Sequence, residues 1–321
     1  MGFRILGTGS AVPDKILTND DLSTMVETSD EWITTRVGVK ERHIATTETT
    51  ASLAAEAARR ALEQSGVAPA DLDLIVCATI TADNVSPTAA GEVQEALGAA
   101  CPAFDVSSAC SGFLFALECA AGFFARGTVK HVLVIGAERI SKLLDWNDRS
   151  TCVIFGDGAG AAVLGACEDD HYLVSELFTA GGSDVIQIPA FAGQSPFRVI
   201  PEGERPPTIF MEGQETFKFA VNAMCEHIRS MAEKIGAAPS DIHFVVPHQA
   251  NLRIIAMASR KLDIPMERFL VNIQHYGNTA AASVPIALDE ANRAGRLHPG
   301  DLVAMCAFGG GLSSAGAIVR W

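Results

Sequence analysis

The chain is organised around the stretch Phe104-Asp105-Val106-Ser107-Ser108-Ala109-Cys110-Ser111-Gly112-Phe113-Leu114-Phe115. A short β-like run stops at Cys110. From residue 111 to 126 there is no proline, and Leu, Phe, Ala and Cys fall on every face of a helical wheel. A helix that is apolar all round is buried. The cysteine therefore stands where a strand turns into a buried helix. The helix dipole and the unpaired N–H groups there favour thiolate over thiol, so Cys110 is a candidate nucleophile.

Most cysteines are small, inert core residues, and we apply this interpretation to the other seven. They lie in apolar surroundings and are Cys77, Cys101, Cys119, Cys152, Cys167, Cys225 and Cys306. Cys110 differs because its neighbours from Ser107 to Gly112 are small. Small neighbours leave room for a substrate to approach the sulfur.

The composition indicates a soluble globular protein. The 321 residues are 48% hydrophobic and 19% charged, enough for a large core and two domains. The sequence contains neither a long uninterrupted apolar run nor a signal segment, so we expect a cytosolic protein. Eight cysteines without a CxxC pair or a His/Cys cluster predict reduced thiols and no metal or other cofactor. The net charge of −14 argues against general nucleic-acid binding, so an anionic partner would need a local basic patch.

Strand and helix patterns alternate along the chain and then start again. In the first half we predict strands at 3–12, 74–80, 104–110 and 131–137, helices at 19–26, 29–36, 50–64, 87–97 and 111–126, and two strands around a glycine turn at 152–165. The acidic break at 168–170 divides the chain into two predicted halves, residues 1–168 and residues 172–321. In the second half we predict strands at 172–180, 242–246, 269–273 and 302–308, a long helix around 217–231, helices at 251–262 and 281–294, and a Gly/Pro-rich excursion at 181–207.

The two halves end alike, which predicts two copies of one α/β unit. Residues 155–163 read Phe-Gly-Asp-Gly-Ala-Gly-Ala-Ala-Val, and residues 308–319 read Phe-Gly-Gly-Gly-Leu-Ser-Ser-Ala-Gly-Ala-Ile-Val. In this register the Cys110 corner is equivalent to the corner around Asn278, and strand 74–80 is equivalent to the strand ahead of His248. Taken alone, such a histidine is usually structural and an Asn beside Gly is usually a turn. Because ligands of open α/β sheets bind at strand carboxyl ends, we expect Cys110, His248, Asn278 and glycines 309–311 at one site.

Several motifs together resemble the β-ketoacyl-[acyl-carrier-protein] synthase III family of the thiolase-like superfamily. They are Ser29-Asp30-Glu31-Trp32-Ile33, Glu41-Arg42-His43-Ile44-Ala45, Ser108-Ala109-Cys110-Ser111-Gly112-Phe113, Phe155-Gly156-Asp157-Gly158-Ala159-Gly160, His248-Gln249-Ala250-Asn251-Leu252-Arg253-Ile254 and Gly277-Asn278-Thr279. The resemblance implies a duplicated five-layer α/β/α/β/α fold, usually a homodimer. It also implies an acyltransferase that condenses an acyl-CoA starter with malonyl-[acyl-carrier-protein] and releases carbon dioxide, to begin type II fatty-acid synthesis.

The same resemblance implies a Cys-His-Asn triad at Cys110, His248 and Asn278. The Cys110 thiolate would attack the starter thioester and expel CoA. By resemblance, the backbone N–H groups of Cys110 and Gly310 would hold the oxyanion. His248 and Asn278 would then donate hydrogen bonds to the malonyl thioester carbonyl as decarboxylation turns it into an enolate. This chemistry requires no metal.

Two further surfaces follow from charge pattern and resemblance. Trp32 and Arg36 share a helix face, and with Arg42 and His43 they are candidates for a cradle around a planar phosphate-bearing group, although Trp32 is equally compatible with plain core. By resemblance, Trp32 and Arg149 stack on the CoA adenine and Arg36 lies near its phosphates.

On helix 251–262, Arg253 and Arg260 project opposite the apolar stripe, with Lys261 beside it. A solvated polar face explains this pattern equally well. The resemblance favours docking of the acidic carrier protein, with Lys218 taking part.

One departure from the family concerns the substrate. Some relatives that prefer acetyl starters carry a phenylalanine just before the proline that matches Pro87, and it reaches the acyl pocket across the dimer. Here that position is Ser86. The smaller side chain predicts tolerance of longer or branched starters.

Two other interpretations stay open. A related condensing enzyme or acyltransferase of polyketide or signal-molecule synthesis can share the whole framework. A non-catalytic partner subunit is the third possibility, and the complete triad and glycine turn speak against it.

Overall fold

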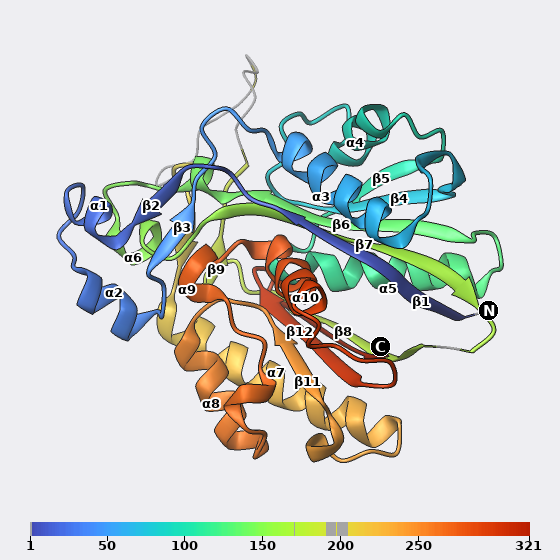
Figure 1. Cartoon of the computed structure of the whole chain (residues 1–321). Coiled ribbons are helices and arrows are strands. Elements are labelled where there is room, and N and C mark those ends of the chain that lie inside the picture. Colours follow the sequence, from blue (N-terminus) through green and yellow to red (C-terminus); the bar gives the residue numbers. More distant parts are fainter. Residues whose placement is uncertain (1, 170, 191–196, 198–204) are drawn as a thin grey trace.

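Two β-sheets frame the protein in the computed structural model, which describes residues 2–169, 171–190, 197 and 205–321 (Figure 1). The first sheet has the order β1-β7-β6-β4-β5 and the second the order β11-β12-β13-β8. The strands of the first are β1 (Gly2–Ala11), β4 (Leu74–Ala78), β5 (Ala103–Val106), β6 (His131–Arg139) and β7 (Asp157–Cys167), and those of the second are β8 (Tyr172–Thr179), β11 (Phe244–Pro247), β12 (Leu302–Gly309) and β13 (Ser313–Arg320).

The pairing pattern of the first sheet recurs in the second. β1 and β7, like β6 and β7, pair antiparallel, whereas β4 and β6 pair parallel. In the second sheet β8 and β13, like β12 and β13, pair antiparallel, and β11 and β12 pair parallel. The fifth place, held by β5 beside β4, is taken in the second sheet by an isolated parallel bridge between Val245 and Phe269. The predicted boundary between the halves falls in the connection from β7 to β8.

Helices cover the two sheets in three layers. α3 (Thr50–Ser65) and α4 (Ala89–Leu97) pack on the outer face of the first sheet, and α7 (Gly213–Lys234) and α8 (Leu252–Leu262) on the outer face of the second. α5 (Gly112–Ala125) and α10 (Ser283–Arg293) lie between the sheets (Figure 1). This is the predicted five-layer α/β/α/β/α thiolase-like arrangement, and the fold prediction is confirmed.

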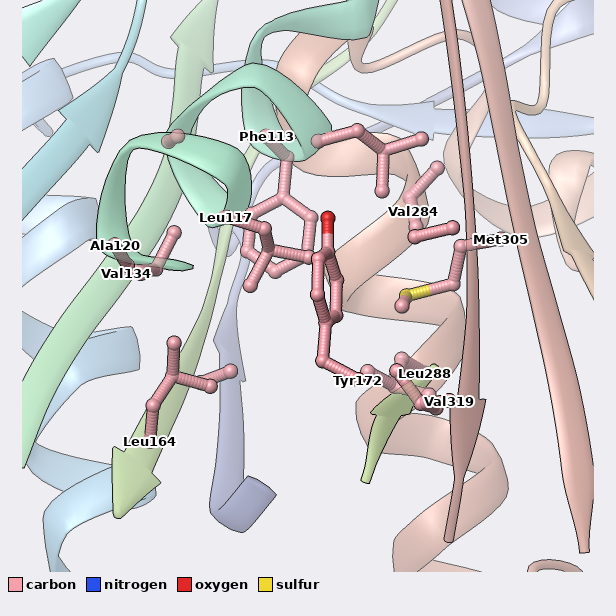
Figure 2. Close-up of a cluster of buried hydrophobic side chains, with 14 of the residues drawn as sticks. Phe113, Leu117, Ala120, Val134, Leu164, Tyr172, Val284, Leu288, Met305 and Val319 are labelled. Carbon is pink, nitrogen blue, oxygen red and sulfur yellow. The ribbon is translucent and has the colours of Figure 1, made fainter. Parts of the chain in front are cut away.

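The central core holds the two sheets together through α5 and α10. Figure 2 shows Phe113 and Leu117 of α5 facing Val284 and Leu288 of α10 and Met305 of β12, all of them buried. Each such side chain contributes roughly 1.5–3 kcal/mol when it leaves water. α5 is therefore buried on the face that meets both sheets. Cys119, Gly122 and Ala125 are exposed on its other side, so the prediction of a helix buried all round is wrong in part.

Residues 157–165 belong to one continuous strand, so the prediction of two strands around a glycine turn within 152–165 is wrong. A short helix, α6 (Arg149–Cys152), precedes the continuous strand β7. The glycines serve close packing, because a Cβ on Gly160 would stand 2.7 Å from the backbone nitrogen of Ile286 in α10. β7 is paired on both edges, with β1 and with β6.

The strand predicted at 269–273 is also wrong, and the side chain of Gln249 explains why. Its Oε1 accepts hydrogen bonds from the backbone N–H groups of Asn272 (3.1 Å) and Ile273 (3.2 Å), and its Nε2 donates to the Leu270 carbonyl (3.0 Å). A side chain thus replaces the strand ladder there, and a short helix α9 (Ile273–Tyr276) follows.

The remaining elements are short or lie near the site. They are β2 (Ile16–Thr18), α1 (Asn19–Ser23), α2 (Asp30–Arg36), β3 (Glu41–His43), β9 (Ile186–Gln187) and β10 (Phe210–Met211). α4 begins at Ala89 after the N-cap Thr88, so Pro87 precedes the helix and does not open it as predicted. Of the excursion predicted at 181–207, β9 pairs with β10, whereas 191–196 and 198–204 lie outside the described residues. Among the described residues no helix combines the length and apolarity that crossing a membrane requires.

Candidate active site

Cys110 stands at the predicted corner between β5 and α5. A single 3-10 turn, Ala109–Ser111, joins the two, and Ala109 adopts a left-handed backbone conformation with φ of 44°. The Ser111 hydroxyl donates to the Ser108 carbonyl at 2.8 Å and lies 2.7 Å from the hydroxyl of Ser313 in the second half. The turn that presents the sulfur is therefore fixed from both halves of the chain.

The glycine-rich end of β12 lies directly against this turn. A Cβ built on Gly309 would stand 2.9 Å from the backbone nitrogen of Cys110, so only glycine fits without displacement. The neighbouring Gly310 N–H has no acceptor among the described residues, while its carbonyl accepts from the Ser313 hydroxyl at 2.9 Å. Gly310 thus keeps a backbone donor available beside the sulfur.

His248 follows β11 and is buried. Its backbone N–H donates to the Cys306 carbonyl at 2.7 Å, and its ring lies edge-on to Phe308 with centroids 5.3 Å apart. Its Nδ1 is buried and has no hydrogen-bond partner among the described residues. The imidazole is therefore held by packing, and its ring nitrogens are not committed to a carboxylate.

Asn278 follows α9 and reaches the site through a backbone bridge with Phe155 of the first half. Its Oδ1 accepts the backbone N–H of Ala280 at 2.9 Å, and only 5% of the residue is exposed. That bond fixes the side-chain orientation and leaves Nδ2 to donate.

One cavity of about 950 Å³ brings the three predicted side chains together. It is lined by Cys110, His248 and Asn278 and by the glycines 309–311, so both halves contribute. The rest of the lining is mostly apolar and includes Ile80, Phe115, Ile140, Ile154, Phe155, Ile186, Ile209, Met211, Phe217 and Phe308. In the described part of the chain no cluster of three or more His, Cys, Asp and Glu side chains is arranged for a metal ion.

The electrostatics of the cavity differ from our expectation for the thiol. Burial, with the Glu138 carboxylate adding to it, raises the pKa of Cys110 to about 12, so the expected preference for thiolate is wrong for the unliganded protein. Burial likewise lowers the pKa of His248 to about 3. Both groups are neutral at pH 7. A neutral imidazole can accept a proton, and a thiol must lose one during attack.

The Trp32–Arg149 pair that the resemblance implies for CoA is formed in the structure. The Arg149 guanidinium carbon lies 5.3 Å from the centre of the Trp32 ring, and the Arg149 Nη1 also donates to the Glu27 carbonyl at 2.7 Å. Arg36 lies on α2 with Trp32 and is exposed. Its backbone carbonyl accepts a hydrogen bond from the Asn251 side chain at 3.0 Å. Asn251 and the Arg149 neighbour Ser150 both line the cavity, so this pair adjoins its entrance.

Arg42 does not belong to that cradle. It is fully buried, and its guanidinium donates to the Asn19 side chain at 2.9 Å and to the carbonyls of Leu17 (3.1 Å) and Val153 (2.8 Å). The Arg42 guanidinium therefore joins β2, β3 and the segment before β7. No surface is left for a ligand phosphate.

The four predicted docking residues lie on two adjacent helices, α7 and α8. Lys218, Arg253, Arg260 and Lys261 are exposed. Arg253 stacks over Phe217, 5.9 Å from its ring centre, and Phe217 itself lines the cavity. Sequence reasoning missed Arg229 of α7, which donates to the Lys261 carbonyl at 2.6 Å. The sequence did not indicate Arg229 as part of this group, because its contact with Lys261 depends on how α7 and α8 pack.

Ser86, predicted to belong to the acyl pocket, is exposed and does not line the cavity of a single chain. The neighbouring Val85 does line it, although the residue is fully exposed to solvent. Sequence reasoning also missed Glu138, near the end of β6, and Lys142, which follows that strand. The rule that ligands gather at strand carboxyl ends already pointed to this position.

Comparison with known proteins agrees with this geometry. Residues 104–181 match the family model described as 3-oxoacyl-[acyl-carrier-protein] synthase III, and residues 232–321 match its C-terminal counterpart. A β-ketoacyl-[acyl-carrier-protein] synthase III of Caldanaerobacter subterraneus subsp. tengcongensis is 48% identical over 321 residues, covering 99% of this chain and 97% of the relative. The chain belongs to the β-ketoacyl-[acyl-carrier-protein] synthase III family. It is therefore a condensing enzyme and an acyltransferase.

Solved structures of the synthase III family extend the comparison to the fold. The 3-oxoacyl-[acyl-carrier-protein] synthase III of Aquifex aeolicus has a TM-score of 0.93 and 46% identity, with full coverage of both chains. The priming β-ketosynthase of the R1128 polyketide biosynthetic pathway has a TM-score of 0.92 and 36% identity, covering 99% of this chain and 96% of its own. The family framework thus occurs in more than one pathway.

Proposed function

We propose that this synthase III joins an acyl-CoA starter to malonyl-[acyl-carrier-protein] with loss of carbon dioxide, giving β-ketoacyl-[acyl-carrier-protein] as the first step of type II fatty-acid synthesis. One observation carries the proposal. A single cavity is lined by the Cys110 corner of the first half and by His248, Asn278 and the glycine turn of the second.

In the first step Cys110 attacks the thioester carbonyl of the starter. Burial keeps the thiol neutral beforehand, so its proton leaves during attack and ends on the sulfur of the departing CoA. The backbone N–H groups of Cys110 and Gly310 stabilise the oxyanion. Collapse of the tetrahedral intermediate expels CoA as its thiol and leaves an acyl-cysteine.

In the second step His248 and Asn278 hold the malonyl thioester carbonyl. As carbon dioxide leaves, negative charge develops on that oxygen, and donors already in place stabilise it. The Oδ1 bond to Ala280 turns the Asn278 Nδ2 toward this task. The enolate carbon then attacks the acyl-cysteine carbonyl and releases the Cys110 sulfur, which takes up a proton from solvent and returns to the thiol.

Substrates enter past two charged surfaces. Trp32 and Arg149 stack on the adenine of CoA, with Arg36 near its phosphates. The acidic carrier protein docks on the patch formed by Lys218, Arg229, Arg253, Arg260 and Lys261, which overcomes the unfavourable net charge locally. Phe217 connects the patch to the cavity, since it lies under Arg253 and lines the cavity wall.

The working unit is a homodimer in the cytosol. Two features support the dimer: β5 is an edge strand next to the active-site corner, and Val85 lines the cavity while it is fully exposed in one chain.

Sequential mass spectrometry tests the proposal. Incubation with acetyl-CoA or another acyl-CoA is expected to add one acyl mass to Cys110, and the Cys110→Ser variant is expected to form no thioester. Addition of malonyl-[acyl-carrier-protein] should then remove the adduct and yield the β-ketoacyl product. An enzyme that is not acylated by any acyl-CoA contradicts the proposal and favours a non-catalytic subunit.

A second candidate is priming of a polyketide or signal-molecule pathway. The similarity to the R1128 priming β-ketosynthase favours it, since that chain shares the fold at 36% identity. Acceptor choice separates the two. Turnover with malonyl-[acyl-carrier-protein] of the fatty-acid pathway supports the first candidate, whereas preference for malonyl-CoA or for another carrier supports the second.

A further inference from the structure

Thr81 is held from two sides by charged residues, Glu138 in β6 and Lys142 just after that strand. It is 1% exposed and lines the active-site cavity. Its hydroxyl donates to the Glu138 carboxylate at 2.5 Å, and its carbonyl accepts from the Lys142 ammonium at 2.6 Å. The Thr50 hydroxyl donates to the same carbonyl at 2.6 Å. The wall of the cavity at this point is therefore fixed by side chains far away in the sequence.

Glu138 anchors the segment through its backbone as well. Its carboxylate is fully buried and accepts the N–H of Ile80 at 3.2 Å and the hydroxyl of Thr79 at 3.3 Å. Burial raises the pKa of this carboxyl to about 8, an effect that the bonds from Thr81 and Ile80 and the charge of Lys142 oppose. Removing any of these partners leaves a buried carboxyl group with fewer hydrogen bonds, which is costly.

Lys142 is the one charged residue among the described residues that line the cavity. It stands between Ile140 and Leu143, which are buried in the apolar cluster that Cys110 packs against. Its ammonium also donates to the Ala82 carbonyl at 2.9 Å. Two of its three N–H groups are thus bound to backbone oxygens, and the residue lines a cavity whose other lining side chains are mostly apolar.

We infer that Lys142, held by Thr81 and Ala82, determines starter specificity by limiting how long a saturated acyl chain the cavity accepts. The inference rests on the proposed function and deepens it. An acyl chain that extends past Ile80 and Ile140 meets the ammonium and displaces water from it. An alkyl group cannot replace the hydrogen bonds that this water makes to the charge, so binding is weakened. Short starters stop before that contact. Lys142 does not touch the reacting atoms, so it selects the substrate without taking part in the chemistry.

The test compares acylation of Cys110 by octanoyl-CoA and by acetyl-CoA in matched variants. Lys142→Met keeps the length of the side chain and removes the charge, so the octanoyl-to-acetyl ratio of acylation rates is expected to rise about tenfold, the size of one or two extra apolar contacts in a pocket. Lys142→Arg keeps the charge and should stay within about threefold of the wild-type ratio. Thermal unfolding of each variant verifies that it folds.

A second pair tests the clamp that holds the ammonium. Thr81→Val removes the hydroxyl bond to Glu138 and should raise the ratio in the same direction, about threefold, while Thr81→Ser keeps the bond and the wild-type ratio. An unchanged ratio in Lys142→Met, or an equal rise in Lys142→Arg, overturns the inference while acylation itself still supports the proposed function. Absence of wild-type acylation with every acyl-CoA instead overturns the proposed function, and the inference with it.

Discussion

A Cβ atom placed on Gly309 would stand 3.0 Å from the Cβ of Cys110 and 3.2 Å from its Sγ. The end of β12 in the second half and the nucleophile of the first half are therefore in direct contact. No side chain fits between them, and the sulfur, the Cys110 N–H and the Gly310 N–H are held in one arrangement by this approach. The first prediction follows from it.

Gly309→Ala is expected to lower the rate of Cys110 acylation by about 100-fold, because a displacement near 1 Å at a reacting atom costs roughly that factor. The new methyl group must move either the Cys110 turn or the glycine loop. The rate is measured by mass spectrometry with acetyl-CoA. Gly122→Ala in α5 is the matched control, since a Cβ there meets nothing within 4 Å. A Gly309→Ala enzyme with wild-type acylation would show that the close approach has no role.

The neutral thiol predicts a steep pH dependence of alkylation. Iodoacetamide reacts with thiolate, and for a pKa of about 12 the thiolate fraction rises about tenfold for each pH unit. Labelling of Cys110, followed by peptide mapping, should therefore accelerate from pH 7 to pH 9 without levelling off. Glu138 gains charge over this range because its pKa is about 8, which makes the rise somewhat less steep. A plateau reached below pH 8 would mean that the free enzyme already holds a thiolate.

That prediction also marks a limit of sequence reasoning. The position of Cys110 before a buried helix could be predicted, because an all-apolar helix after a short strand has few other interpretations. The pKa could not. The helix dipole is visible in the sequence, whereas the desolvation by Ile80, Phe155 and the glycine turn depends on segments that the fold brings together.

The strand order was predictable where apolar runs and glycine motifs repeat, and less so where a side chain replaces the backbone. Residues 269–273 have strand composition, yet Gln249 takes their hydrogen bonds. Glycines 158 and 160 read as part of a turn but belong to β7, where they pack closely against α10. Likewise, nothing local to Lys142 shows that it reaches Thr81, since their contact joins the chain after β6 to the chain after β4.

Starter choice is expected to depend on Ser86 through the partner subunit of the proposed dimer. The wild-type enzyme should be acylated by octanoyl-CoA, because serine leaves the neighbouring cavity open. Ser86→Phe should lower that rate about tenfold and leave acetyl-CoA within about twofold, since added bulk excludes long chains first. Ser86→Ala is the control and should behave as wild type. A strict preference of the wild-type enzyme for acetyl-CoA would contradict this prediction.

Carrier docking is expected to depend on Arg253. Reversing its charge in Arg253→Glu should raise KM for malonyl-[acyl-carrier-protein] roughly tenfold, about 1.4 kcal/mol, and the effect should shrink at high salt. Acylation by acyl-CoA should change less, because the proposed CoA contacts are made by Trp32, Arg36 and Arg149. Arg59→Glu on α3 reverses an exposed charge elsewhere and serves as control. Equal changes in the two variants would reflect net charge only.

The central claim is that Cys110 performs acyl transfer while the second half supplies donors for decarboxylation at the same cavity. The most direct measurement follows both steps in His248→Ala and in Asn278→Ala: acyl-cysteine formation with acetyl-CoA, then carbon dioxide release with malonyl-[acyl-carrier-protein]. We predict that each variant retains measurable acylation and loses condensation by at least about 100-fold, the usual cost of one oxyanion donor. Equal loss of both steps, or condensation at the wild-type rate, would contradict this division of labour.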